Sequence, residues 1–192
     1  MLLYHTGFQE IRDPDVHFSR ANADFGQGFY LTPDRDFAER WARSRRGRDT
    51  WLNAYELDMA GLRVLRLERN EAWYDCIFKN RAGLMPDMGG ADVVIGPIAN
   101  DTIYNVAGVL TSGLLMRDQA LALLRLGPEY RQVALRTEAA AKRLRWLSAR
   151  RLEEKEIARC REQVRAEEAA YLELFSKELE RLMEGGAQRP PK

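Results

Sequence analysis

Two short segments near the start of the chain hold residue types that could form a ligand site. Residues 3–7 are a short apolar run that ends in His5 and a small-residue turn. Residues 24–32 place two glycines around a glutamine, directly before an aromatic strand predicted over residues 29–32. Glycines lack a Cβ and let a backbone come close to a flat ligand. Because side chains alternate across a strand, Tyr30 can line a pocket while its two neighbours enter the core.

Both segments resemble motifs of the ADP-ribosyltransferase superfamily, in the histidine–tyrosine branch that includes diphtheria toxin and the poly(ADP-ribose) polymerases. Tyr-His-Thr-Gly at residues 4–7 is similar to the first motif of that branch, and Gly-Gln-Gly-Phe-Tyr-Leu-Thr at residues 26–32 is similar to the second. Residues 1–150 more closely resemble a bacterial family of uncharacterised domains in this superfamily. The three motifs of that family are similar to residues 24–32, 92–101 and 132–137 of this chain.

The resemblance implies an α+β fold with an ADP-ribosyltransferase-like split β-sheet core, flanking helices and a long C-terminal helix. We expect the ADP-ribosyltransferase-like domain over residues 1–150, a helical extension over 151–184 and a disordered tail over 185–192. Within the domain, alternating apolar residues predict a strand hairpin of residues 51–58 and 63–67 around Gly61. Caps and helical spacing predict further helices over residues 35–43, from 70, and over 102–110, 117–124 and 137–144, with strands over 2–5, 92–96 and 130–136.

The resemblance also implies that NAD is the substrate, that no metal is needed, and which residues hold it. His5 would hydrogen-bond a ribose hydroxyl, and the backbone of Thr6, beside Gly7, would hold the nicotinamide amide. Tyr30, which follows Gly28, would supply one flat face for the nicotinamide ring. The chain offers two further contacts, a second aromatic face from Trp41 and a forked contact from Arg20 to the pyrophosphate.

The third catalytic position departs from the polymerases, which use a glutamate at the start of a late strand. Gln132 stands in the matching place here. Glutamine accepts a hydroxyl hydrogen bond but carries no charge to stabilise an oxocarbenium ion. Either Gln132 suffices, or Asp101 supplies the charge from a segment with Asn100 that folds toward the pocket. Asn100 and Asp101 could equally cap the following helix, and they could do both.

The leading hypothesis is therefore a mono-ADP-ribosyltransferase that modifies a protein or nucleic acid, as the toxin of a toxin–antitoxin or phage-defence pair. Two alternatives stay open: a catalytically weak domain that binds NAD or a protein, and an NAD glycohydrolase. The basic segment of residues 43–48, with four arginines, could grip a nucleic-acid acceptor, although such runs are usually a solvated face.

Composition limits the other function classes. The formal net charge of +1 gives no reason to expect nonspecific attraction to nucleic acid or membranes. Cys76 and Cys160 fit no metal spacing, no signal segment is visible, and no apolar run approaches about 20 residues, so we expect a cytoplasmic protein that does not enter a membrane. Residues 152–183 contain no helix breaker, and their apolar stripe could pack on the domain itself or dock a partner such as an antitoxin.

Overall fold

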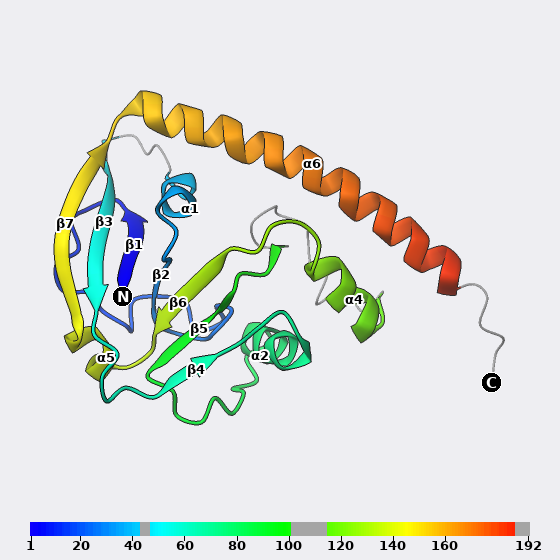
Figure 1. Cartoon of the computed structure of the whole chain (residues 1–192), viewed down its shortest axis with the longest axis horizontal. Coiled ribbons are helices and arrows are strands. Elements are labelled where there is room, and N and C mark those ends of the chain that lie inside the picture. Colours follow the sequence, from blue (N-terminus) through cyan, green and yellow to red (C-terminus); the bar gives the residue numbers. More distant parts are fainter. Residues whose placement is uncertain (43–46, 101–114, 187–192) are drawn as a thin grey trace.

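Strand-forming residues assemble into two separate β-sheets in the computed structural model, which describes residues 1–42, 47–100 and 115–186. The strands are β1 (Leu2–Gly7), β2 (Phe29–Leu31), β3 (Thr50–Leu57), β4 (Val64–Arg66), β5 (Val93–Pro97), β6 (Arg131–Leu135) and β7 (Leu144–Leu152). The helices are α1 (Arg35–Arg40), α2 (Glu71–Arg81), α4 (Arg117–Leu124), α5 (Glu138–Lys142) and α6 (Glu154–Gly186). One sheet has the order β1-β3-β7 and the other β2-β6-β5-β4 (Figure 1). The expectation of an α+β fold with two sheets and a long C-terminal helix is confirmed.

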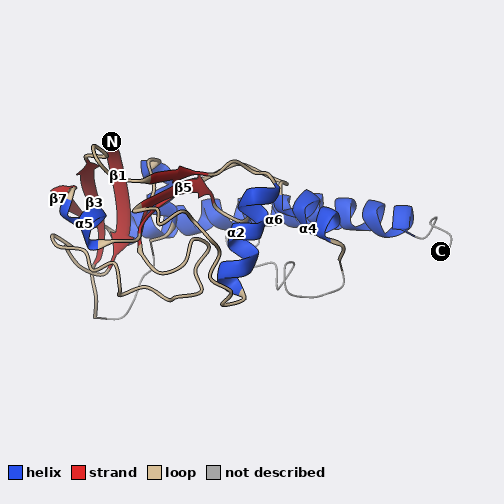
Figure 2. Ribbon diagram, turned by 90° about the horizontal axis from the view of Figure 1, so that it is seen from below, coloured by secondary structure: helices blue, strands red, loops and turns tan. Residues whose placement is uncertain are grey.

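The four-stranded sheet is buried on both faces because successive residues of its central strands enter different apolar clusters. Val93 and Ile95 of β5 join a cluster that also holds Leu3 and Tyr55 from the other sheet. Val94, between them, joins a second cluster with side chains of α2 and α4. The sheet therefore lies between the three-stranded sheet and a layer of helices (Figure 2). This is the alternation expected of strands that are covered on both sides.

Two strands are connected differently from the sequence-based prediction. The hairpin predicted from residues 51–58 and 63–67 is wrong, because β3 already has β1 on one edge and β7 on the other. The chain turns at Gly61, whose φ is +76°, and crosses to the other sheet. There β4 pairs in parallel with β5, with Val64 opposite Val93. Strand β7, which follows α5 directly, is not predicted from the sequence.

Helix boundaries follow the capping residues closely. Asp34 caps α1 by accepting from the Phe37 amide at 3.0 Å, and Asn70 caps α2 by accepting from the Trp73 amide at 3.1 Å. Thr137 caps α5 in the same way. Each is a short polar side chain that satisfies an otherwise unpaired amide of the first helical turn.

The long helix α6 packs on its own domain along much of its length. Its first half contacts α1, and its second half contacts α4 (Figures 1 and 2). Tyr171 is buried, and Phe175, Leu179 and Leu182 pack against the cluster beneath α2 and α4. The apolar stripe expected over residues 172–182 is thus largely covered by the domain. The helix runs to Gly186, and residues 187–192 lie outside the described part of the chain.

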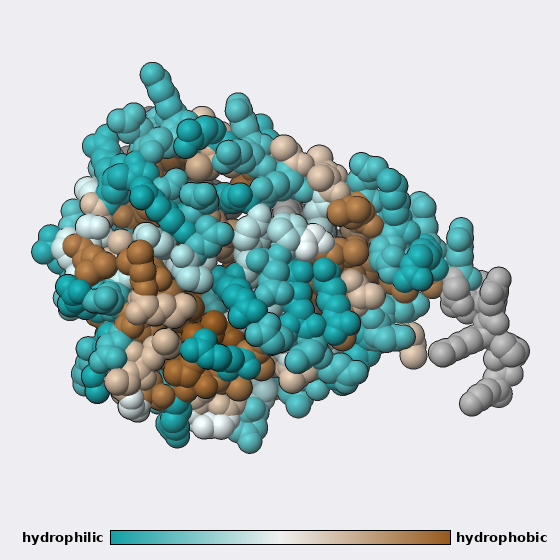
Figure 3. All heavy atoms as spheres, viewed as in Figure 1, coloured by the Kyte–Doolittle hydropathy of each residue, from teal (hydrophilic) through white to brown (hydrophobic). Residues whose placement is uncertain are grey.

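The face of the molecule in Figure 3 is mostly hydrophilic, with apolar side chains gathered around α5 and β4. None of the helices in the described ranges combines the length and apolar character that a membrane span needs.

Candidate functional site

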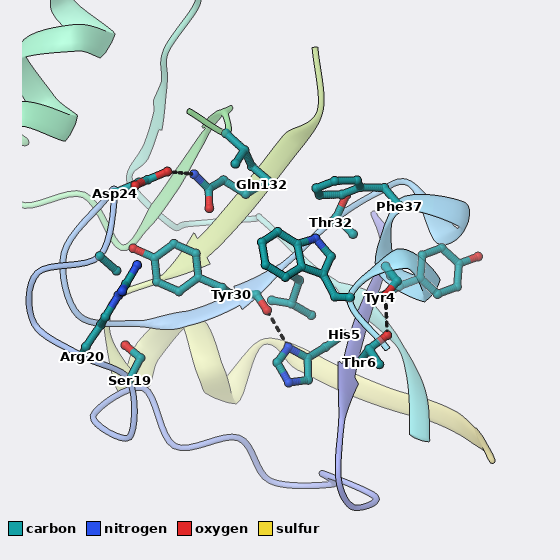
Figure 4. A pocket seen from close by; sticks show the side chains of 15 residues that line it. Tyr4, His5, Thr6, Ser19, Arg20, Asp24, Tyr30, Thr32, Phe37 and Gln132 are labelled. Carbon is teal, nitrogen blue, oxygen red and sulfur yellow. Dashed lines mark hydrogen bonds between the residues drawn. The ribbon is translucent and has the colours of Figure 1, made fainter. Parts of the chain in front are cut away.

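One cavity of about 370 Å³ lies beside β1 and β2, where the two sheets meet (Figure 4). The strands are joined there by a single antiparallel bridge between Tyr4 and Thr32. The cavity is lined by side chains from β1, the loop that follows it, β2, α1 and β6, together with one residue after β5. These are Tyr4, His5, Thr6, Ser19, Arg20, Ala23, Asp24, Tyr30, Leu31, Thr32, Phe37, Ala38, Trp41, Ile98 and Gln132.

The backbone of Thr6 is directed to the side of β1 that faces away from β3. Tyr4 uses both its amide and its carbonyl to pair with Thr32, at 2.8 and 3.0 Å. Backbone groups of an antiparallel strand alternate between its two edges, so residues 4 and 6 present theirs to the same edge. Beyond the bridge this edge runs along the cavity, where the Thr6 N–H can donate to the oxygen of a ligand amide and the Thr6 carbonyl can accept from its nitrogen. The Thr6 side chain is engaged elsewhere, since Oγ1 donates to the Ala38 carbonyl at 2.6 Å.

His5 spans the gap between the two strands. Its Nδ1 lies 2.8 Å from the carbonyl oxygen of Tyr30. Because a carbonyl only accepts, Nδ1 carries the proton in the neutral ring, and Nε2 is left as an acceptor. Burial lowers the pKa of His5, although the hydrogen bond to Tyr30 opposes this shift. The site therefore favours a neutral imidazole that can accept a hydrogen bond from a ligand hydroxyl.

Tyr30 offers its ring to the cavity, because its polar end is already occupied. Its hydroxyl donates to the Gly26 carbonyl at 2.6 Å and accepts from the Phe25 amide at 3.0 Å. Burial raises the pKa of this hydroxyl, so it stays protonated at neutral pH. The two neighbours of Tyr30 on β2 are buried in the cluster between the sheets, as the alternation predicts. The side chain is thus fixed at both ends with an aromatic surface available.

Another wall of the cavity comes from α1, which packs against β1, and from the residue that ends this helix. Phe37 and Trp41 meet edge to face with ring centroids 5.8 Å apart, and Phe37 stacks on Tyr130 at 4.2 Å. Trp41 is 39% exposed, which is high for an indole with aromatic contacts on one side. A flat ligand in the cavity would cover that open surface.

The α1 wall is tied to two distant elements by Arg40. Its Nη1 lies 2.5 and 2.7 Å from the two carboxylate oxygens of Glu167 on α6, and it also donates to the hydroxyl of Tyr130. Tyr130 donates in turn to Glu167 at 3.2 Å. This three-residue network fixes α1 between α6 and the start of β6.

Gln132 of β6 reaches the cavity beside a carboxylate that the sequence did not single out. Its Nε2 donates to Oδ2 of Asp24 at 3.0 Å, and both side chains are buried (Figure 4). Oδ1 of Asp24 accepts from Nη2 and Nε of Arg81 at 2.7 and 2.9 Å. Asp24 belongs to one of the quoted motifs, but its motif position carries no sign that it meets a strand far along the chain.

Six of the residues predicted for the site line this cavity together, namely His5, Thr6, Arg20, Tyr30, Trp41 and Gln132. Gly7, Gly28 and Asn100 are not among the lining residues that the structure describes, and Asp101 lies outside the described ranges. Residues 102–110 and 43–46 also lie outside them.

The structure gives Gly28 and Asn100 packing roles. A Cβ at Gly28 would lie 2.5 Å from the Leu135 carbonyl oxygen, so the close approach is to the neighbouring strand β6. Asn100 is fully buried, donates to the Leu126 carbonyl and accepts from Nη2 of Arg69 at 3.2 Å. It therefore holds the turn that precedes β6, which carries Gln132.

A comparison with protein-family models places the chain in a family described as a protein of unknown function, DUF3990, which matches residues 1–146. The chain belongs to this family. Comparisons with curated proteins and with solved structures gave no match. The DUF3990 match includes every residue that lines the cavity, whereas α6 lies beyond it. Glu167, which fixes the α1 wall, is therefore an addition from outside the family region.

The DUF3990 cavity combines two aromatic surfaces, a backbone edge and several polar side chains. It could bind a flat heteroaromatic ring between Tyr30 and Trp41 and hold an amide at Thr6. His5 and Gln132 could hold hydroxyl groups near that ring, and Arg20 lies on an exposed loop where a phosphate could reach it. Among the described residues, no group of His, Cys, Asp and Glu is arranged to hold a metal ion.

Proposed function

We propose that this chain is a mono-ADP-ribosyltransferase that transfers ADP-ribose from NAD to a macromolecule. The observation that carries the proposal is the convergence of His5, Tyr30, Trp41 and Gln132 on one cavity, although they come from β1, β2, the end of α1 and β6. Residues that merely matched a motif by chance would have no reason to share a pocket. We also assign the two-sheet core to the ADP-ribosyltransferase-like fold, since the cavity lies where β1 and β2 meet.

In this proposal each group holds one part of NAD. The nicotinamide ring lies on Tyr30 with Trp41 on its other side, and the Thr6 backbone holds the carboxamide. His5 accepts from a ribose hydroxyl at Nε2, and Gln132 accepts from the hydroxyl next to the anomeric carbon. Arg20 meets the pyrophosphate at the rim.

The reaction breaks the bond between nicotinamide and the anomeric carbon. Nicotinamide leaves with the bonding electron pair and becomes neutral, while a nucleophilic atom of the acceptor bonds to the anomeric carbon and loses one proton. Positive charge develops on the ribose in the transition state. Interactions that strengthen at this stage raise turnover, whereas ring stacking contributes mainly to binding.

The acceptor is a protein or a nucleic acid, and we extend the proposal to a toxin in a toxin–antitoxin or phage-defence pair. The motif resemblance to stand-alone bacterial domains supports this extension. NAD hydrolysis would use the same pocket with water as the nucleophile.

Labelled NAD incubated with the full chain and a bacterial lysate tests the proposal. Label on protein or nucleic acid supports transfer, free ADP-ribose indicates an NAD glycohydrolase, and neither product indicates a binding domain. At an NAD concentration well below saturation, Tyr30→Ala should lower the yield of either product about tenfold, because it weakens binding. Phe78→Ala is the matched control, because Phe78 is an aromatic on α2 that does not line the cavity and is 36% exposed.

A further inference from the structure

The amide of Gln132 has a fixed direction, because Asp24 can only accept from it. Asp24 is 5% exposed and Gln132 8% exposed, so neither group can exchange its partner freely for water. The carboxylate meets donors on both oxygens, from Arg81 on one side and Gln132 on the other. A third donor, the Ala99 amide, lies 3.5 Å from Oδ2.

We infer that Asp24 is a positioning residue that turns the Gln132 amide so that Oε1 faces the cavity as a hydrogen-bond acceptor. Nε2 and Oε1 point in different directions from the amide carbon, so with Nε2 directed at Asp24 the oxygen points away from it, and Figure 4 shows Oε1 on the cavity side. If the amide were turned over, Oε1 would meet a carboxylate oxygen at 3.0 Å with no proton between them. The identity of the ligand hydroxyl rests on the proposed function, but the direction of the amide does not.

The same contact strengthens the acceptor. A carboxylate that accepts from the amide nitrogen draws electron density toward Oε1, and hydrogen bonds in a chain polarise one another in a poorly solvated site. Arg81 balances the charge of Asp24, which allows a carboxylate to stay buried behind the glutamine. A neutral glutamine is thereby given part of the negative character that a glutamate would bring.

Asp24 is held in place independently of the ligand. Asn80 and Arg81, at the end of α2, both contact it, since Nδ2 of Asn80 donates to the Asp24 carbonyl at 3.1 Å. The loop around it is fixed by Gln27, whose Nε2 donates to the carbonyls of His17 and Ser19. The acceptor direction of Gln132 is thus built into the apo fold.

The first test is Asp24→Asn. The Arg81 guanidinium would still bind the side-chain oxygen at position 24, so Nδ2 of the new asparagine would face Gln132. Gln132 would then turn its Oε1 toward this NH₂ group and away from the cavity. The cavity would then meet an NH₂ group in place of an acceptor. We expect turnover of NAD to fall about tenfold to a hundredfold while KM changes less than about threefold. Activity within twofold of the wild type would overturn the inference.

The second test exchanges the two groups. Gln132→Glu places two carboxylates about 3 Å apart, so one of them must take up a proton. If the new carboxyl takes it up, its OH donates to Asp24 as the amide does and its second oxygen still faces the cavity, so turnover should stay well above that of Asp24→Asn. The double variant Asp24→Asn/Gln132→Glu restores a donor–acceptor pair with an acceptor facing the cavity. Its turnover should exceed that of Asp24→Asn at least tenfold. A double variant no more active than Asp24→Asn would overturn the inference, since a purely structural contact predicts that the effects of the two substitutions accumulate.

A stability measurement separates this inference from the proposed function. In Gln132→Glu the pKa of one carboxyl would be raised above its unfolded value, so the folded state binds the extra proton. Its melting temperature should therefore be nearest to the wild type at about pH 4.5 and fall further behind as the pH rises to about 7.5. The double variant should not show this loss.

If the wild type neither turns over nor binds NAD, the proposed function fails, while this pH dependence still tests whether Asp24 contacts the side chain at position 132. A Gln132→Glu variant with the pH profile of the wild type would overturn the inference.

Discussion

At the scale of single residues, the site separates groups that are already satisfied from groups that are free to serve a ligand. Tyr30 illustrates this division, because its hydroxyl has a donor and an acceptor partner inside the protein while its ring lines the cavity. His5 shows the same pattern, with Nδ1 occupied by a backbone carbonyl. In both, the internal hydrogen bond fixes the side chain and leaves one chemical surface for recognition.

Tyr30→Phe and Tyr30→Ala should therefore have different effects. The phenylalanine keeps the ring but leaves the Gly26 carbonyl and Phe25 amide without their partner, which costs about 1–3 kcal/mol of folding free energy. Its affinity for NAD should stay within about twofold. The alanine also removes the stacking surface, and its affinity should fall about tenfold or more. Titration calorimetry and thermal unfolding measure the two effects, and equal affinity loss in both variants would contradict the stacking role.

The depressed pKa of His5 predicts a pH-dependent stability. In the unfolded chain an ordinary histidine binds a proton near pH 6.5, whereas burial keeps the folded imidazole neutral to lower pH. The unfolded state thus binds more protons below about pH 6.5, and stability must fall as the pH drops through that value toward the folded pKa.

His5→Asn should flatten the dependence of folding stability on pH below about 6.5. His17→Asn, at the other histidine, is the control. Melting temperatures between about pH 5 and 7.5 measure it. A wild-type slope that survives His5→Asn would assign the effect to another group.

Sequence patterns singled out Tyr30 and His5, which line the cavity, but not Asp24, which also lines it. Alternation on a strand was enough to place Tyr30, because it depends only on nearest neighbours. Asp24 and Gln132 are 108 residues apart, and their contact depends on how β6 lies against the loop before β2. A one-dimensional pattern contains no information about such a contact. The role suggested for Asp101, which lies outside the described residues, stays a prediction.

At the scale of elements, local signals predicted helices well and strand pairing poorly. Asn70 and Thr137 each predict the start of a helix, because a capping side chain accepts from an amide in the first turn of its own helix. The hairpin predicted around Gly61 failed for the opposite reason. Whether β3 pairs with β4 depends on competition from β1 and β7, which are distant in sequence and take both of its edges.

The element most in need of support is α1, a short helix that carries one wall of the cavity. Glu167→Gln removes the charge that α6 offers to Arg40 and should loosen that wall. Since both side chains are partly exposed, we expect a stability loss of only about 1 kcal/mol. The affinity for NAD should fall about threefold to tenfold, because Trp41 would be less well placed. Glu162→Gln, at an exposed position of the same helix, is the control.

Binding measurements with the isolated chain test this prediction. If Glu167→Gln loses stability but keeps full affinity, the network serves folding alone and α1 needs no brace from α6.

At the scale of the whole molecule, α6 joins the α1 end of the cavity to the helical layer beneath the four-stranded sheet. It lies outside the family region, yet it covers apolar side chains that would otherwise face water. Its apolar side chains differ in how far the domain covers them. Phe175 and Leu179 pack against the domain, whereas Leu172 and Leu174 are 43% and 49% exposed.

This asymmetry separates the two functions that the helix could have. Phe175→Ala/Leu179→Ala removes packing and should lower the free energy of unfolding by about 2–4 kcal/mol, a partial cost because both residues are only partly buried. Leu172→Ala/Leu174→Ala should cost less than about 1 kcal/mol. Denaturant unfolding compares the pairs. Equal losses would show that these two leucines are also covered, which a concentration-dependent melting temperature would trace to self-association. If these exposed leucines contact a protein partner, the second pair should weaken that complex without altering NAD turnover, because neither leucine lines the cavity.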